Sequence, residues 1–233
     1  MDRPFVFINV AMTADGKIDT FARKGAAISS QRDKERVDRL RAESDAVMVG
    51  GRTLLDEDPK LTVKSDALRE ERIARGLTPN PIKVGVVTKA ELNSHSKFIY
   101  EGGGRVVIFT THRTSKDQLA SLRSHDLKDR VEVFVHEGER VDLRNMMQTL
   151  KELGINRLMV EGGGTLNFEL IRLGLVDEVS AYVAPMIFGG EKAPTMVSGS
   201  GFERGEAVPL KLIHAEQWDD GGVLLNYKVE RST

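Results

Sequence analysis

Short runs of apolar and β-branched residues recur along the chain, separated by polar stretches. The runs long enough to be strands cover residues 5–12, 45–51, 82–88, 105–111, 131–137 and 157–163. Their apolar positions are nearly continuous and do not alternate, which is typical of strands buried on both faces. The pattern therefore predicts a mostly parallel sheet covered by helices.

Helices are predicted between these runs because the intervening segments carry start and stop signals. Serine or aspartate precedes three of the segments, and glycine ends two of them. The predicted helices cover residues 29–44, 115–123, 141–154 and 164–174. The charged, proline-containing segment 65–81 is predicted to be an exposed insertion.

The pattern changes after residue 174. Two apolar runs within residues 209–230 flank the sequence DDGG at 219–222, which predicts an antiparallel hairpin with its turn at the glycines. A chain of 233 residues is long enough for one large domain or two small ones. We expect a single α/β domain over residues 1–233, with a mostly parallel sheet that ends in an antiparallel hairpin.

Composition narrows the classes of partner. The net charge of −1 gives no general attraction for nucleic acid or anionic lipid, so neither is an expected partner. No apolar run approaches the roughly 20 residues that span a bilayer, and no targeting segment is evident. The absence of cysteine excludes thiol catalysis and thiolate metal sites and is compatible with a reducing compartment. We expect a cytoplasmic protein.

The five histidines show no metal-ligand spacing. They lie at His95, His112, His125, His136 and His214. No metal site and no catalytic histidine are therefore expected.

The sequence VEGGGT, residues 160–165, places a glutamate and three glycines between a buried run and a predicted helix. Bare backbone N–H groups at a positive helix end suit an anion, and most naturally a diphosphate. The alternative is a tight strand-to-helix turn with no ligand. The spacing is neither GxGxxG nor a P-loop, so an ordinary Rossmann or kinase-like site is not indicated.

Two other predicted strands end in similar groups. Asp15, Gly16 and Lys17 follow the first strand, at the end of an open α/β sheet where ligands usually bind. Glycines and Thr53 follow the second strand. A capped turn at Asp15 and helix capping by Thr53 are the alternatives without a ligand.

Taken together, these stretches resemble the reductase family of riboflavin biosynthesis, in its single-domain archaeal and fungal type, which is related in fold to dihydrofolate reductase. The resemblance is carried by NVAMTADGKID at 9–19, GRTLLDEDPKLTV at 51–63, KVGVVT at 83–88 and the long run LMVEGGG…IFGG at 158–190. It implies a three-layer fold, a homodimer and NADPH-dependent reduction of 2,5-diamino-6-ribosylamino-4(3H)-pyrimidinone 5′-phosphate.

The resemblance also implies roles for individual residues. Lys17 is expected to hydrogen-bond or protonate the ring oxygen of the ribose, and Asp15 to orient it or to stabilise the developing iminium. Cofactor contacts are expected at Thr53, Glu57, Val87, Thr88, Glu161, Gly162, Gly163, Gly164, Thr165 and Leu166. Substrate contacts are expected at Asn9, Ser30, Arg41, Leu61, Lys64 and Glu161. Glu57 departs from the family, which usually has aspartate there.

Within the substrate set, Arg41 and Lys64 are expected to hold the 5′-phosphate, and Glu161 to accept hydrogen bonds from the pyrimidine. Selection of NADPH needs a basic or hydroxyl cluster for its 2′-phosphate. The first expectation is Thr88 with Lys89; the second is a group of three residues, Thr110, Thr111 and Arg113. NADH stays possible.

Several alternatives stay open at this point. Bacterial relatives carry a zinc deaminase domain with cysteine ligands; since this chain has no cysteine, we expect another protein to perform deamination, which favours the diamino substrate. Reduction of the deaminated pyrimidine, or of a pterin or folate on the same fold, are the rival activities. A non-catalytic nucleotide-binding regulator is the rival of another class.

Overall fold

A computed structural model of the chain describes residues 2–93 and 95–230. Contacts within the chain divide it into two compact units, each made of two segments. The first unit consists of Met1–Pro4 and Asp38–Met159, and the second of Phe5–Val37 and Val160–Thr233. The single domain over residues 1–233 stays a prediction.

The first unit is built on parallel strands. Its strands are ordered β5-β4-β3-β2-β6, and β2 to β5 pair in parallel. They are β2 (Ala46–Gly50), β3 (Ile82–Val86), β4 (Val106–Thr111), β5 (Val131–His136) and β6 (Arg157–Val160). Gly50 lies opposite Val86, so the loops that follow β2 and β3 leave the sheet at the same edge.

Burial of these strands follows their place in the sheet. All five residues of β2 and all six of β4 are buried, which confirms the predicted two-sided burial for these strands. In β5, which ends the strand order, only Val131 is buried. The prediction was wrong there, because an edge strand has a neighbour on one side only.

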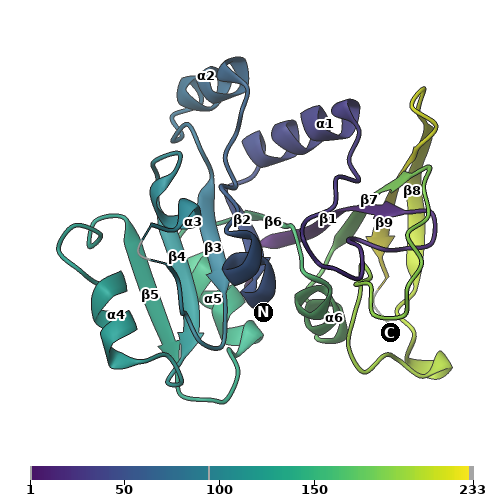
Figure 1. Ribbon diagram of the computed structural model, residues 1–233. Helices are drawn as coiled ribbons and strands as arrows, with labels where there is room; N and C mark the ends of the chain where they lie inside the picture. The colour runs from purple at the N-terminus through teal and green to yellow at the C-terminus, as the bar shows by residue number, and fades with distance from the viewer. Residues whose placement is uncertain (1, 94, 231–233) are drawn as a thin grey trace. The chain divides into compact units, whose positions relative to one another are not determined.

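Helices cover both faces of the first unit's strands. Figure 1 shows the short π-helix η1 (Thr53–Glu57) in front of them and α5 (Leu143–Glu152) behind. α5 buries Leu143, Met146, Met147 and Leu150 along one side, which is the pattern of an amphipathic helix on a core. The remaining helices of this unit are α2 (Asp66–Ala74), α3 (Lys97–Tyr100) and α4 (Lys116–Leu122).

The segment 65–81, predicted to be an exposed insertion, contains helix α2, and most of its residues are exposed. Ser65 caps its first turn, and Leu68 and Arg72 are buried. The Arg72 guanidinium donates to the backbone oxygens of Ala42 at 2.7 Å and Ser44 at 2.8 Å. The predicted exposure thus holds for most of the segment, whereas the burial of Arg72 depends on the carbonyls of Ala42 and Ser44, far away in sequence.

The second unit contains the antiparallel part of the fold. Its strands β1 (Phe5–Thr13), β7 (Glu178–Ala184), β9 (Val223–Val229) and β8 (Leu210–Gln217) lie in that order. β1 and β7 are parallel, whereas β9 is antiparallel to both β7 and β8. The predicted C-terminal hairpin is thus confirmed as β8 and β9, and the α/β class with a mostly parallel sheet is confirmed as well.

A small aromatic cluster packs against the hairpin. The Tyr182 and Trp218 rings stack with their centroids 5.2 Å apart, and Ile28, Ala184 and Leu224 complete the cluster. A Cβ added at Gly222 would lie 2.4 Å from the Tyr182 ring. Packing against Tyr182 therefore requires glycine at position 222, and Gly221 beside it has φ +83°, a turn conformation that favours glycine.

Two helices link these strands to the rest of the chain. α1 (Gln31–Ala42) begins in the second unit, and α6 (Gly164–Arg172) follows β6. η2 (Arg204–Glu206) is a single 3₁₀ turn. Among the described residues, no helix has the length and apolar character needed to cross a membrane.

Candidate active site

A tight loop at the end of β1 holds Lys17. The backbone N–H of Lys17 donates to the Thr13 hydroxyl at 2.9 Å, and the N–H of Thr13 donates to the Lys17 carbonyl at 2.8 Å. Gly16 has φ +76°, a conformation that favours glycine. Lys17 also forms an isolated antiparallel bridge with Thr195, so the lysine backbone is held from two sides.

Asp15, in the same loop, is engaged by its own chain. Its carboxylate accepts hydrogen bonds from the Thr13 hydroxyl at 2.5 Å and from the backbone N–H groups of Gly189 at 2.7 Å and Phe188 at 3.2 Å. The bond from Thr13, helped by the two backbone donors, holds the pKa of Asp15 below its ordinary value. Asp15 is thus a charged anchor between the Lys17 loop and residues 188–189.

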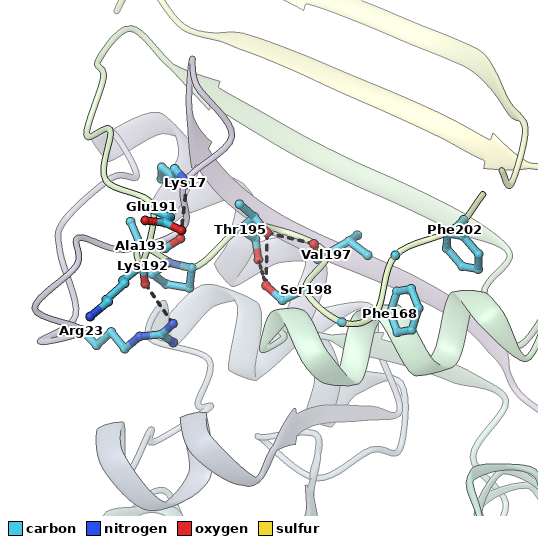
Figure 2. Close-up of a pocket in the computed structure, with 13 residues that line it drawn as sticks. Lys17, Arg23, Phe168, Glu191, Lys192, Ala193, Thr195, Val197, Ser198 and Phe202 are labelled. Carbon is cyan, nitrogen blue, oxygen red and sulfur yellow. Dashed lines mark hydrogen bonds between the residues drawn. The ribbon is translucent and has the colours of Figure 1, made fainter. Parts of the chain in front are cut away.

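A pocket of about 410 Å³ lies beside this loop, within the second unit. Figure 2 shows Lys17 at one end of it and Phe168 with Phe202 at the other. The Lys17 Nζ lies 3.5 Å from the carbonyl oxygen of Ala193, a long contact that leaves its other protons available. The wall between the two ends is residues 191–199, a segment that the sequence analysis did not single out.

In the glycine turn after β6, Gly162 and Gly164 have different surroundings. Gly162 has φ +96°, and a Cβ there would meet nothing within 4 Å, so the space above it is open. A Cβ at Gly164 would lie 2.4 Å from the Thr195 carbonyl oxygen and 2.7 Å from the Ser198 hydroxyl. The close approach at Gly164 is therefore to the chain's own residues, so packing alone accounts for this glycine.

The first-turn N–H groups of α6 remain suited to an anion. α6 begins at Gly164, and Gly163 at its N-cap supplies no side chain to the helix end. The first N–H groups of a helix have no acceptor within the helix. Of the predicted cofactor residues, this turn brings together Gly162, Gly163, Gly164, Thr165 and Leu166, directly after Glu161.

Ser30 and Asn9, two predicted substrate residues, lie in the second unit. The Ser30 hydroxyl accepts from the N–H of Asp33 at 3.2 Å, ahead of α1. Ser30 also hydrogen-bonds to Asp220 and holds the pKa of that carboxyl below its ordinary value. Asn9 is buried in β1, and its Oδ1 accepts from Arg36 at 2.7 Å. Both side chains are thus held by other protein groups.

Three other predicted substrate residues, Arg41, Leu61 and Lys64, lie in the first unit. Arg41 donates to the carbonyl oxygen of Thr62 at 3.1 Å, and the backbone N–H of Lys64 donates to Asp38 at 2.6 Å. Leu61 is buried and has φ +48°. The segment from Leu61 to Lys64 is therefore fastened against the C-terminal half of α1, and the Lys64 side chain is exposed.

The remaining predicted cofactor residues follow β2 and β3. Thr53 opens η1, and Glu57 closes it on the exposed side. Val87 comes directly after β3, and a Cβ added at Gly51 would lie 3.1 Å from its Cγ2. The two loops consequently pack closely, which places Thr53 and Val87 at one edge of the strands.

The second predicted group for a 2′-phosphate does not offer free hydroxyls. Thr110 and Thr111 are fully buried, and both hydroxyls donate to the Thr88 carbonyl oxygen, at 3.3 Å and 2.8 Å. They stabilise the loop after β3 and are closed to a ligand. The expectation fails for these two threonines because their hydroxyls satisfy a buried carbonyl, whereas the expectation for Arg113 stays a prediction.

Asp58 is a structural residue that sequence reasoning missed. Its φ is +44°, and its carboxylate accepts from the Ser96 hydroxyl at 2.6 Å and from the N–H groups of Lys97 and Phe98. Burial acts to raise the pKa of Asp58, but these hydrogen bonds outweigh it and the pKa is lowered. Asp58 therefore caps α3 from 38 residues away. No local signal reveals such a cap.

The described residues contain no candidate metal site. No group of three or more histidine, cysteine, aspartate or glutamate side chains gathers there in a way that would hold an ion.

Solved structures give the class of protein first. Acinetobacter baumannii RibD superposes with a TM-score of 0.77 at 24% identity, over 98% of this chain and 58% of that one. The riboflavin biosynthesis reductase Rib7 of Saccharomyces cerevisiae superposes with a TM-score of 0.70 at 20% identity, over 98% of this chain and 90% of that one. At these identities the match concerns the fold alone, which is an α/β fold with a mostly parallel sheet.

The family follows from the sequence comparison. A family model described as the RibD C-terminal domain matches residues 4–224. Two archaeal relatives are both named 2,5-diamino-6-ribosylamino-4(3H)-pyrimidinone 5′-phosphate reductase. The Archaeoglobus fulgidus protein is 42% identical, over 86% of this chain and 89% of its own length. The Methanothermobacter thermautotrophicus protein is 41% identical, over 90% of this chain and 91% of its own length. The chain belongs to the RibD C-terminal domain family.

Proposed function

We propose that this protein reduces the ribosyl group of 2,5-diamino-6-ribosylamino-4(3H)-pyrimidinone 5′-phosphate to the ribitylamino product, a step of riboflavin biosynthesis. The observation that carries the proposal is the similarity to two reductases of that name, which spans 86% and 90% of this chain.

Lys17 is the proposed proton donor. Its backbone is held by Thr13 and Thr195, and its side chain lines the pocket of Figure 2. An ammonium there is able to protonate the ring oxygen as the ribosylamine opens. Asp15 supports this role by fixing the loop, through its bonds to Phe188 and Gly189, and it adds negative charge near a developing iminium.

Different residues are proposed to bind the phosphate and the pyrimidine of the substrate. Arg41 and Lys64 supply positive charge for the 5′-phosphate, with Arg41 already oriented by the Thr62 carbonyl. Glu161 supplies a hydrogen-bond acceptor for the amino and ring N–H groups of the pyrimidine. Leu61, Asn9 and Ser30 complete the proposed substrate set.

NADPH is the proposed cofactor, and it supplies the hydride when it is bound. The open space above Gly162 and the first-turn N–H groups of α6 fit a diphosphate. Thr53, Glu57, Val87 and Thr88 are proposed to contact the rest of the dinucleotide. Lys89, exposed beside Thr88, is the proposed partner of the 2′-phosphate, which would favour NADPH over NADH.

A homodimer in the cytoplasm is proposed for the working enzyme. The last strand of the order, β8, exposes Leu210, Leu212 and Ile213. Apolar side chains on an edge strand suit association with a second copy of the chain.

The direct test is to follow absorbance at 340 nm with purified protein, NADPH and the ribosylaminopyrimidine phosphate. Loss of absorbance with formation of the ribitylamino product is expected, and the deaminated pyrimidine is expected to react more slowly. Dihydrofolate is the matched control and should give no signal. A flat trace with both pyrimidines would support a non-catalytic regulator instead.

A further inference from the structure

A row of polar side chains crosses the sheet of the second unit. Asn9 of β1 lies opposite Ser180 of β7, and Ser180 lies opposite Asn226 of β9. The Ser180 hydroxyl donates to Oδ1 of Asn226 at 2.7 Å. Buried polar groups inside a sheet need hydrogen-bond partners. The side chain that hydrogen-bonds to this row therefore fixes the orientation of its polar groups.

Arg36 of α1 is that side chain. Its guanidinium donates to the Asn9 Oδ1 at 2.7 Å and to the Ser180 hydroxyl at 2.8 Å. Nε and Nη2 both donate to Oδ1 of Asp33, at 2.9 Å and 2.8 Å. The Asp33 side chain is 0% exposed and that of Arg36 15% exposed. The buried carboxylate therefore balances the charge of Arg36 and fixes its planar fork.

The chemistry of arginine fixes the amide of Asn9. A guanidinium has donors and no acceptor, so the oxygen of Asn9 must face Arg36 and the NH₂ group must face the other way. No described residue accepts a hydrogen bond from that Nδ2, although Asn9 is only 7% exposed. That nitrogen is not one of the fully buried atoms that lack a partner, so it reaches solvent and is open to an acceptor from outside the chain.

We infer that Arg36 is a positioning residue, which holds Asn9 so that its NH₂ group donates to an acceptor atom of the substrate. The acceptor would be a carbonyl oxygen or an unprotonated ring nitrogen of the pyrimidinone. This inference rests on the proposed function, and it adds a rule of specificity. Asn9 reads an acceptor, whereas Glu161 reads donors, so a ring with the opposite pattern is rejected.

The test uses Asn9→Asp and Arg36→Lys, measured for substrate binding without cofactor by calorimetry and for KM and kcat with NADPH. Asn9→Asp keeps an acceptor for Arg36 and loses the donor, so we expect KM and the substrate Kd to rise about tenfold or more. Arg36→Lys keeps the charge beside Asp33 but loses the fork, and a smaller rise of about threefold is expected. The NADPH Kd should stay within about twofold in both.

The matched control is Arg39→Lys, because Arg39 is exposed on the same helix; it should change none of these values. A double substitution separates positioning from general damage. If Arg36 acts through Asn9, Arg36→Lys adds nothing to the KM of Asn9→Ala. An equal further rise in that background, or an Asn9→Asp protein that binds like the parent, would overturn the inference. Since the parent's own turnover is measured first, failure of the proposed function is seen separately.

Discussion

The carboxylate of Asp15 accepts a hydrogen bond from the backbone N–H of Gly189 at 2.7 Å. This contact ties the loop that carries Lys17 to the segment after β7, whose continuation at 191–199 forms the pocket wall. The loop with the proposed proton donor and the wall of its pocket are therefore one hydrogen-bonded assembly. We therefore expect substitutions in this assembly to lower turnover more than they lower the free energy of unfolding.

Removal of the Lys17 ammonium should reduce turnover. We expect Lys17→Ala to lower kcat about tenfold or more, equivalent to at least ~1.4 kcal/mol of transition-state stabilisation, with the NADPH Kd unchanged. Stopped-flow single turnovers and cofactor titration measure the two effects. Lys34→Ala, an exposed lysine of α1, is the control. A loss of turnover below tenfold would remove Lys17 from the proton-donor role.

Acid should loosen the loop through Asp15. The pKa of Asp15 is lowered in the folded protein. The stabilisation that the charged carboxylate gives the loop is therefore fully present above the ordinary aspartate pKa of about 3.9, and it is lost as the pH falls through the lower pKa that Asp15 has in the folded protein. We expect protection of the Phe188 and Gly189 amides against hydrogen exchange to follow that course. In Asp15→Asn the protection should be weak at every pH, and turnover should fall at neutral pH. Equal protection in both proteins would contradict this.

Gly164 should not accept a side chain. Because a Cβ would collide with the Thr195 carbonyl, Gly164→Ala should destabilise the fold by ~1–3 kcal/mol, the usual range for overpacking. Gly205→Ala is the matched control, since a Cβ there meets nothing within 4 Å. Urea unfolding of the two variants measures the difference. If both behave like the parent, residues 195–198 are not packed on the start of α6.

Lys83 should make stability depend on alkaline pH. It is buried in β3, with Nζ 2.6 Å from the carbonyl oxygens of both Phe98 and Glu101. Burial, with the nearby charge of Arg130, lowers the pKa of Lys83 from 10.5 to about 8. Between these values the unfolded chain holds a proton that the folded chain has released, so the free energy of unfolding rises with pH there.

The measurement is urea unfolding between pH 7 and 10, compared with Lys83→Met. The other titrating groups are shared, so the difference between the two proteins isolates Lys83. We expect this difference to move in favour of the parent above pH 8. A difference that stays flat or falls would place the Lys83 pKa at or above its ordinary value.

Local patterns were enough to predict most of the elements. The predicted helix at 164–174 is α6 at Gly164–Arg172, and the predicted hairpin is β8 with β9. Apolar period, cap residues and turn glycines act within a few residues, so they can be read along the chain. α2 escaped prediction because its anchor, Arg72, is satisfied by carbonyls of Ala42 and Ser44, about 30 positions earlier.

The sequence by itself determined where the candidate chemistry lies, at the Lys17 loop and the glycine turn after β6, because strand ends and turn residues mark those places. Only the tertiary structure decided what each group meets. It set Arg36 against Asn9, Asp58 at the start of α3, and the 195–198 segment against Gly164. These partners are far apart in sequence, and folding of the whole chain is what brings them within hydrogen-bond or van der Waals distance.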